Sequence, residues 1–169
     1  PLGTDSVTLS PYLGFESLRP ALDAATANQR GTFVLALTSN PEGKSVQHVG
    51  KAEDTGAVAK QVIAAATAEN TAQTWERMGS CGLVVGATVG EALKELAIDL
   101  STFNGPILSP GYGAQGASAE DLYRIFAGVE SQVLVNSSRG VLSAGPQLAD
   151  LARAAQSARD DLVRARGTS

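Results

Sequence analysis

Thr32-Phe33-Val34-Leu35-Ala36-Leu37 is a six-residue run with five apolar members, and it ends in the polar triplet Thr38-Ser39-Asn40. A near-continuous apolar run of this length is typical of a strand that is buried on both faces of a parallel sheet. Four other short runs have the same character, and each is closed by a small or polar residue. They are residues 6–9, 82–86, 106–109 and 132–135. The sequence therefore predicts five parallel strands.

Helical patterns separate these strands. Apolar residues recur at helical spacing in 17–28, 55–78, 89–96, 118–128 and 146–166. Two of these helices open with the spacing of a capping box, Thr88 with Glu91 and Ser118 with Asp121. Regular alternation of strands and helices predicts βαβ units and hence a parallel α/β sheet.

Two α/β architectures fit this alternation, an open doubly wound sheet and a (β/α)8 TIM barrel. A barrel of about 250 residues uses roughly 31 residues for each unit. At that rate 169 residues hold between five and six units, which matches the five strands and leaves about three units upstream. We predict an α/β partial barrel with roughly strands four to eight, in a single domain over 1–169. The open sheet remains the alternative.

Composition narrows the possible partners. The formal net charge is −4 and no basic run occurs, which argues against a nucleic-acid surface. No apolar stretch reaches the roughly 18 residues of a membrane span. Cys81 is the single cysteine, so we expect a buried thiol and a cytoplasmic protein. His48 has no Cys or carboxylate at metal spacing, and we predict no metal site.

The candidate site lies where the strands end, because barrels place functional residues at the carboxyl ends of their strands. Pro110-Gly111-Tyr112-Gly113-Ala114-Gln115-Gly116 follows the fourth run, and Asn136-Ser137-Ser138-Arg139-Gly140 follows the fifth. Glycines let the backbone approach a ligand and present amide hydrogens, and arginine suits phosphate. Barrels often bind phosphate with the loops after their last two strands. We therefore predict a phosphate site here. The segment Thr38-Ser39-Asn40 fits two interpretations equally, a strand end before a turn at Asn40-Pro41 and a site in which Ser39 hydrogen-bonds a ligand amide.

The motifs together resemble the actinobacterial-type orotidine 5'-phosphate decarboxylases. Five segments carry the resemblance, in the family's order and across the whole chain: 10–15, 35–43, 84–88, 110–116 and 137–139. The resemblance implies a cofactor-free, homodimeric (β/α)8 barrel that converts orotidine monophosphate to UMP. It implies that Ser39 contacts the pyrimidine amide, that Gln115 and Arg139 hold the phosphate, and that the loop from Pro110 to Gly116 closes over it. The predicted substrate-binding set is Thr38, Ser39, Pro110, Gln115, Ser138 and Arg139.

One part of the family pattern is absent. The family's catalytic signature, Asp-x-Lys-x-x-Asp, surrounds none of the four lysines, which are Lys44, Lys51, Lys60 and Lys94. In the family this signature ends the third strand, which would lie upstream of Pro1. We therefore expect no catalytic residue in this chain, no activity from it alone, and a need for the missing amino-terminal barrel portion. The alternatives are another phosphate-binding barrel enzyme, such as a sugar-phosphate decarboxylase or epimerase, and a non-catalytic phosphate-binding α/β module.

Overall fold

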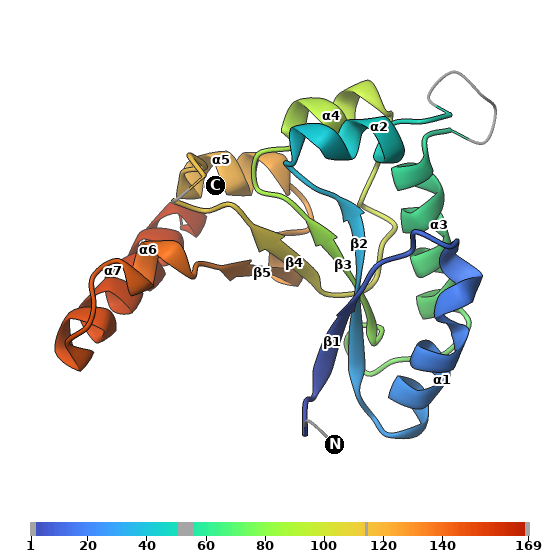
Figure 1. Cartoon of the computed structure of the whole chain (residues 1–169), viewed down its shortest axis with the longest axis horizontal. Coiled ribbons are helices and arrows are strands. Elements are labelled where there is room, and N and C mark those ends of the chain that lie inside the picture. The colour runs from blue at the N-terminus through green and yellow to red at the C-terminus, as the bar shows by residue number, and fades with distance from the viewer. Residues whose placement is uncertain (1–2, 51–55, 114, 168–169) are drawn as a thin grey trace.

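The computed structural model describes residues 3–50, 56–113 and 115–167, and Figure 1 shows its arrangement. Five strands form one parallel sheet in the order β1-β2-β3-β4-β5. Their bounds are Ser6–Leu9, Gly31–Leu37, Cys81–Val85, Ile107–Pro110 and Val133–Asn136. Each bound lies within one residue of the sequence prediction.

Burial alternates along β2, β4 and β5, which indicates that helices cover one face of the sheet more completely than the other. In β2, Val34 and Ala36 are buried in the core, whereas Phe33 and Leu35 are half-buried. Leu108 of β4 and its register partner Leu134 of β5 also lie on the less covered face, and Leu134 is 51% exposed. We call this side of the sheet the bare face.

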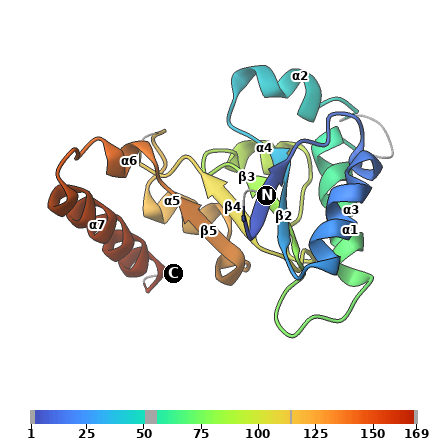
Figure 2. The ribbon, with the colours of Figure 1, turned by 60° about the horizontal axis from the view of Figure 1, so that its bottom comes forward.

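The arrangement excludes the doubly wound alternative. A doubly wound sheet reverses its strand order and carries helices on both faces. Here the strand order follows the chain without reversal, and the helices lie along the outside of a curved sheet (Figure 2). The chain is therefore an α/β unit of the partial-barrel type.

The connections contain seven α-helices among the described residues. They are α1 (Arg19–Ala27), α2 (Lys44–Gln47), α3 (Val58–Thr71), α4 (Gly90–Glu95), α5 (Ala119–Ile125), α6 (Arg139–Leu142) and α7 (Leu148–Arg166). Short 3-10 turns occur at Phe15–Leu18, Pro41–Gly43 and Glu130–Gln132. None of the helices in the described ranges is both long and apolar enough to cross a bilayer.

The prediction of one helix over 55–78 was wrong at its carboxyl end. The helix α3 ends at Thr71, and the expected start at Thr55 lies outside the described residues. Trp75 therefore lies beyond the helix rather than on it, and its Nε1 donates a hydrogen bond to the Asn70 carbonyl at 2.8 Å. The chain turns here because the Asn70 side chain pairs with the first residue of β3.

Asn70 connects α3 to the sheet through a pair of buried hydrogen bonds. Its Nδ2 donates to the Cys81 carbonyl at 2.8 Å, and its Oδ1 accepts from the Cys81 amide at 3.1 Å. A Cβ atom at Gly79 or at Gly105 would lie 2.0 Å or 2.5 Å from the Asn70 side chain. The two glycines therefore leave the space that this amide occupies.

The two predicted capping boxes have different outcomes. At α5, the Ser118 hydroxyl accepts from the Asp121 amide at 3.0 Å and the Asp121 carboxylate accepts from the Ser118 amide, which confirms the prediction. At α4, the box with Thr88 was wrong. Val89 precedes that helix and no side chain caps it, because the turn after β3 places Thr88 one residue too early.

We predict that Asn70→Ala destabilises the chain by about 2–4 kcal/mol, because it leaves the buried amide and carbonyl of Cys81 without partners. Urea unfolding followed by circular dichroism measures the change. Gln73→Ala, an exposed amide in the turn after α3, is the matched control and should shift stability by no more than about 0.5 kcal/mol. Equal effects of the two substitutions would contradict this role for Asn70.

Candidate phosphate-binding site

The carboxyl ends of β2 to β5 meet at one edge of the sheet. The Gly86 amide donates to the Leu37 carbonyl at 2.9 Å, and the Ala87 amide donates to the Pro110 carbonyl at 2.7 Å. Pro110 in turn lies opposite Asn136 in the register of β4 and β5. The segments that follow these strands therefore begin side by side, as the parallel sheet predicts.

A hydrogen bond joins two of the predicted site residues across this edge. Ser39 Oγ donates to Gln115 Oε1 at 3.0 Å, although the two residues are 76 positions apart. Gly111 has a φ of +114°, and a Cβ there would lie 3.3 Å from Gln115 Oε1. A glycine at this position therefore leaves room for the Gln115 side chain to return over the strand ends. Gln115 Nε2 makes no hydrogen bond with the described residues, so its two hydrogens can serve a ligand.

The glycines of this loop do not all present their amides as the sequence analysis expected. The Gly113 amide donates to the Ala117 carbonyl and the Gly116 amide donates to the Gly113 carbonyl, each at 2.9 Å. Both residues have positive φ values, +69° and +93°, which close the loop tightly. These amides hold the loop together, which leaves the Gln115 side chain as a donor free to meet a ligand. Ala114 lies outside the described residues.

Thr38 is held by a residue that the sequence analysis did not single out. The Thr38 amide donates to Gln47 Oε1 and Gln47 Nε2 donates to Thr38 Oγ1, both at 2.9 Å. Gln47 is the last residue of α2, a helix that the sequence analysis did not predict. Pro41 at the start of the preceding turn was the available signal, because proline favours a first helical position. Thr38 therefore positions the strand end, and Ser39 beside it faces the loop.

Ser138 and Arg139 open the short helix α6, directly after β5. Both are exposed, and the Arg139 guanidinium makes no hydrogen bond or ion pair with any described residue. Arg19, by comparison, pairs with Glu69 at 2.8 Å. An arginine without a carboxylate partner at a strand end is available to an anionic ligand.

Tyr112 fixes the same loop from its outer side. Its hydroxyl donates to Asp161 Oδ2 of α7 at 2.8 Å. Burial, the hydrogen bond to Asp161 and the charges of Asp161 and Glu120 together raise the pKa of Tyr112 to about 12, and burial is the largest of these causes. The neutral phenol is thus the form that the folded protein favours.

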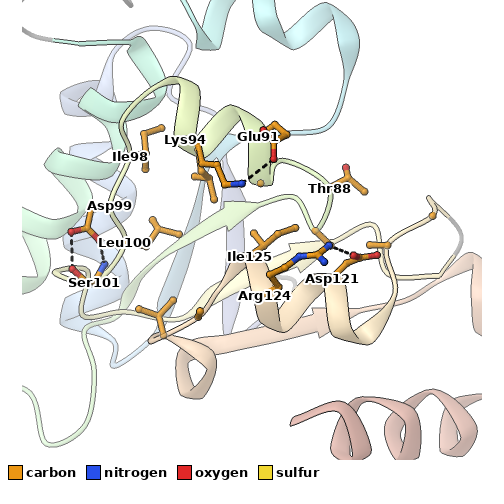
Figure 3. Close-up of a pocket in the computed structure, with 17 residues that line it drawn as sticks. Thr88, Glu91, Lys94, Ile98, Asp99, Leu100, Ser101, Asp121, Arg124 and Ile125 are labelled. Atoms are coloured by element: carbon orange, nitrogen blue, oxygen red, sulfur yellow. Dashed lines mark hydrogen bonds and ion pairs between the residues drawn. The ribbon is translucent and has the colours of Figure 1, made fainter. Parts of the chain in front are cut away.

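A cavity of about 500 Å³ lies between α4 and α5, behind this loop (Figure 3). Leu100 and Ile125 contribute to its apolar wall, and the ion pairs Glu91–Lys94 and Asp121–Arg124 lie beside it. None of the six predicted site residues lines it. The cavity borders the strand ends at Ala87, Thr88 and Gly116 but does not include the predicted binding residues. Within the described ranges, no three metal-binding side chains come together.

Sequence comparison identifies the family. A sequence model of the orotidine 5'-phosphate decarboxylase / HUMPS family matches residues 1–154. The chain belongs to this family.

Orotidine 5'-phosphate decarboxylases of two actinobacteria are similar to most of the chain. The Streptomyces coelicolor protein is 48% identical over 159 residues, and the Salinispora arenicola protein is 49% identical over 155 residues. Each match covers 92% of this chain and 53% of the relative. The chain thus spans about half the length of the curated orotidine 5'-phosphate decarboxylases that it matches.

Solved structures of the same family have this fold. A Streptomyces avermitilis protein provisionally named orotidine 5'-phosphate decarboxylase is 45% identical with a TM-score of 0.82, covering 98% of this chain and 55% of that chain. Leishmania donovani OMP decarboxylase is 25% identical with a TM-score of 0.69, covering 97% of this chain and 58% of that chain. The partial barrel predicted from the sequence is consistent with both.

Because Tyr112 is partly buried and bonded to Asp161, we predict that its phenol ionises late in an alkaline titration of the protein. Ultraviolet absorbance of tyrosinate should show one ionisation near pH 12, and Tyr112→Phe should remove that step. A tyrosine whose folded pKa is raised contributes stability below its unfolded value of about 10 and loses it as pH rises toward 12. Tyr112→Phe should therefore also reduce the loss of stability between these pH values. An unchanged late step in the variant would contradict the assignment.

Proposed function

We propose that this chain forms the phosphate- and pyrimidine-binding part of an orotidine 5'-phosphate decarboxylase, the enzyme that converts orotidine monophosphate to UMP and carbon dioxide without a cofactor. The Ser39–Gln115 hydrogen bond carries the proposal, because it places a hydroxyl from the segment after β2 beside the Gln115 side chain of the loop after β4. Family membership and the 48% identity to the Streptomyces coelicolor enzyme support it.

Each site residue has a part in binding the nucleotide. Gln115 Nε2 and the Arg139 guanidinium donate to phosphate oxygens, and Arg139 adds its positive charge. Ser39 hydrogen-bonds the pyrimidine amide while it orients Gln115, so that the base and the phosphate are held by linked groups. Thr38, Pro110 and Ser138 shape the strand ends around them. The phosphate takes no part in the bond that breaks, so its contacts supply remote binding energy that is used at the reacting carbon.

We propose that the described strand ends of this chain supply no acid or base for the chemistry. The three residues after each strand are 10–12, 38–40, 86–88, 111–113 and 137–139. None of these residues is Lys, Asp or Glu. By the family resemblance, a lysine of the Asp-x-Lys-x-x-Asp signature protonates the ring carbon as carbon dioxide leaves. We propose that this signature comes from a further barrel portion and that the 169-residue chain alone is inactive.

The exposed surface supports a missing barrel portion. A compact 17.3 kDa monomer exposes about 7,800 Å², whereas this chain exposes 9931 Å². The excess is consistent with the bare face and with unpaired edges on β1 and β5, which pair with no further strand among the described residues. Three more strands would cover both. We further propose that the completed barrel is a cytoplasmic homodimer, for which the buried free thiol of Cys81 and the family resemblance are the support.

Fragment assembly tests the proposal. Coexpression of this chain with the part of the Streptomyces coelicolor relative that lies outside the match should yield a complex that consumes orotidine monophosphate. The chain alone should show no turnover. The absorbance change of the pyrimidine ring measures the reaction. A complex that forms but does not consume orotidine monophosphate, while it accepts a sugar phosphate, would favour the alternative of another phosphate-binding barrel enzyme.

We predict that Arg139→Ala weakens UMP binding by about tenfold to a hundredfold, the effect of losing a charged hydrogen bond of about 1.5–3 kcal/mol. Isothermal titration of the assembled protein with UMP, supported by the thermal shift, measures it. Arg30→Ala is the matched control, because Arg30 is an exposed arginine that pairs with Asp5 just before β2, at the opposite edge of the sheet. UMP binding that is equal in both variants would remove Arg139 from the phosphate site.

A further inference from the structure

The loop after β4 is closed at its base but has few contacts at its tip. Tyr112 and Ala117 form an isolated β-bridge, and the Gly113 amide bonds the Ala117 carbonyl. Gln115 lies between these two positions and is exposed, apart from its bond to Ser39. Any displacement of Tyr112 would therefore move the loop that carries the Gln115 amide.

Asp161 lies on the face of α7 that packs against the rest of the chain. The half-buried or buried residues of this helix recur at helical spacing, and they include Leu151, Ala154, Ala158, Leu162 and Ala165. Asp161 shares their face but is ionisable, so its carboxylate needs a hydrogen-bond donor where water is partly excluded. The Tyr112 hydroxyl is the donor that it meets.

Helix α7 is well placed to transmit this contact. It packs against α5, which follows the loop, and against α6, which carries Arg139 at its first position. The family match ends at residue 154, so Asp161 lies on the part of α7 beyond it. The same helix thus borders both elements that follow the last two strands.

We propose that Asp161 is a positioning residue, which holds the loop from Pro110 to Gly116 through the Tyr112 hydroxyl so that Gln115 faces the phosphate site. The role of Gln115 in this statement rests on the proposed function, whereas the control of the loop by Asp161 does not. Loss of the contact leaves the chemistry of the phosphate donors unchanged but lets the loop sample positions in which Gln115 points elsewhere.

Amide hydrogen exchange on the 169-residue chain tests control of the loop without any ligand. Asp161→Ala and Tyr112→Phe should each raise exchange at the Gly113 and Gly116 amides about tenfold, while the amides of α7 and β4 keep their protection. Asp161→Asn retains an acceptor oxygen and should restore most of the protection. Asp160→Ala, at the neighbouring position where the carboxylate pairs with Arg159, should behave as wild type. Loop exchange in Asp161→Ala that equals that in Asp160→Ala would overturn the proposal, as would a general loss of α7 protection.

Ligand binding to the assembled protein separates the two proposals. Tyr112→Phe and Asp161→Ala should each weaken UMP binding about fivefold to tenfold, with no further loss in the double variant, and should leave uridine binding unchanged. Tyr123→Phe is the matched control, because its hydroxyl makes no hydrogen bond with the described residues. Wild-type protein that fails to bind UMP would refute the proposed function and leave the exchange result standing. Normal UMP binding in both single variants would refute the link between Asp161 and Gln115.

Discussion

The parallel register of β2 to β5 is the constraint on which the rest of the structure depends. Direct hydrogen bonds join the ends of three strands, through the Gly86 amide with the Leu37 carbonyl and the Ala87 amide with the Pro110 carbonyl. Because parallel strands finish at the same edge, residues that are 76 positions apart in the chain come within hydrogen-bonding distance. A shift of one residue in this register would turn Ser39 away from Gln115, since side chains alternate between faces. The sheet therefore determines which groups can act together on a ligand.

The same sheet also explains why the chain has one covered and one bare face. Helices pack on the side of Val34 and Leu83, where the side chains are fully buried. On the other side the Phe33 ring lies over Gly82, where a Cβ would come within 2.6 Å of the ring. Leu108 and Leu134 continue this apolar side without a covering helix among the described residues. In a closed barrel such residues fill the interior. The exposed apolar side and the unpaired strand edges therefore have the same cause, which is that the sheet of this chain is not closed.

Sequence patterns predicted the elements better than their ends. The strands were placed to within one residue because short apolar and β-branched runs favour strands. The α5 cap was found because Ser118 and Asp121 interact locally. The end of α3 was missed because it depends on Asn70 bonding to Cys81, eleven positions away, and no local pattern reports such a pairing. The Thr88 cap was wrong because a capping spacing does not determine where the turn after a strand places the first helical residue.

The candidate site was likewise predicted only in part. Its location followed from the sequence, because glycine-rich and arginine-containing segments after parallel strands must share an edge. The hydrogen-bond donors of the site did not follow from the sequence. The Gly113 and Gly116 amides bond within the loop, and only the folded chain shows this. Nor does any sequence signal relate Tyr112 to Asp161 across 49 positions.

The candidate site uses a side-chain donor on a loop that is closed by its own hydrogen bonds. The position of that donor therefore depends on how the loop is held. A cradle of backbone amides would be fixed by the backbone that forms it, whereas the Gln115 amide can leave its place whenever the loop or the side chain turns. Ser39 restrains Gln115 from the β2 side, and Asp161 restrains Tyr112 from the side of α7. Both restraints are exposed or partly exposed hydrogen bonds, which typically contribute only about 0.5–1.5 kcal/mol each. The Gln115 amide is therefore held by two weak restraints, and under the proposed function the binding energy of a phosphate group would add to them.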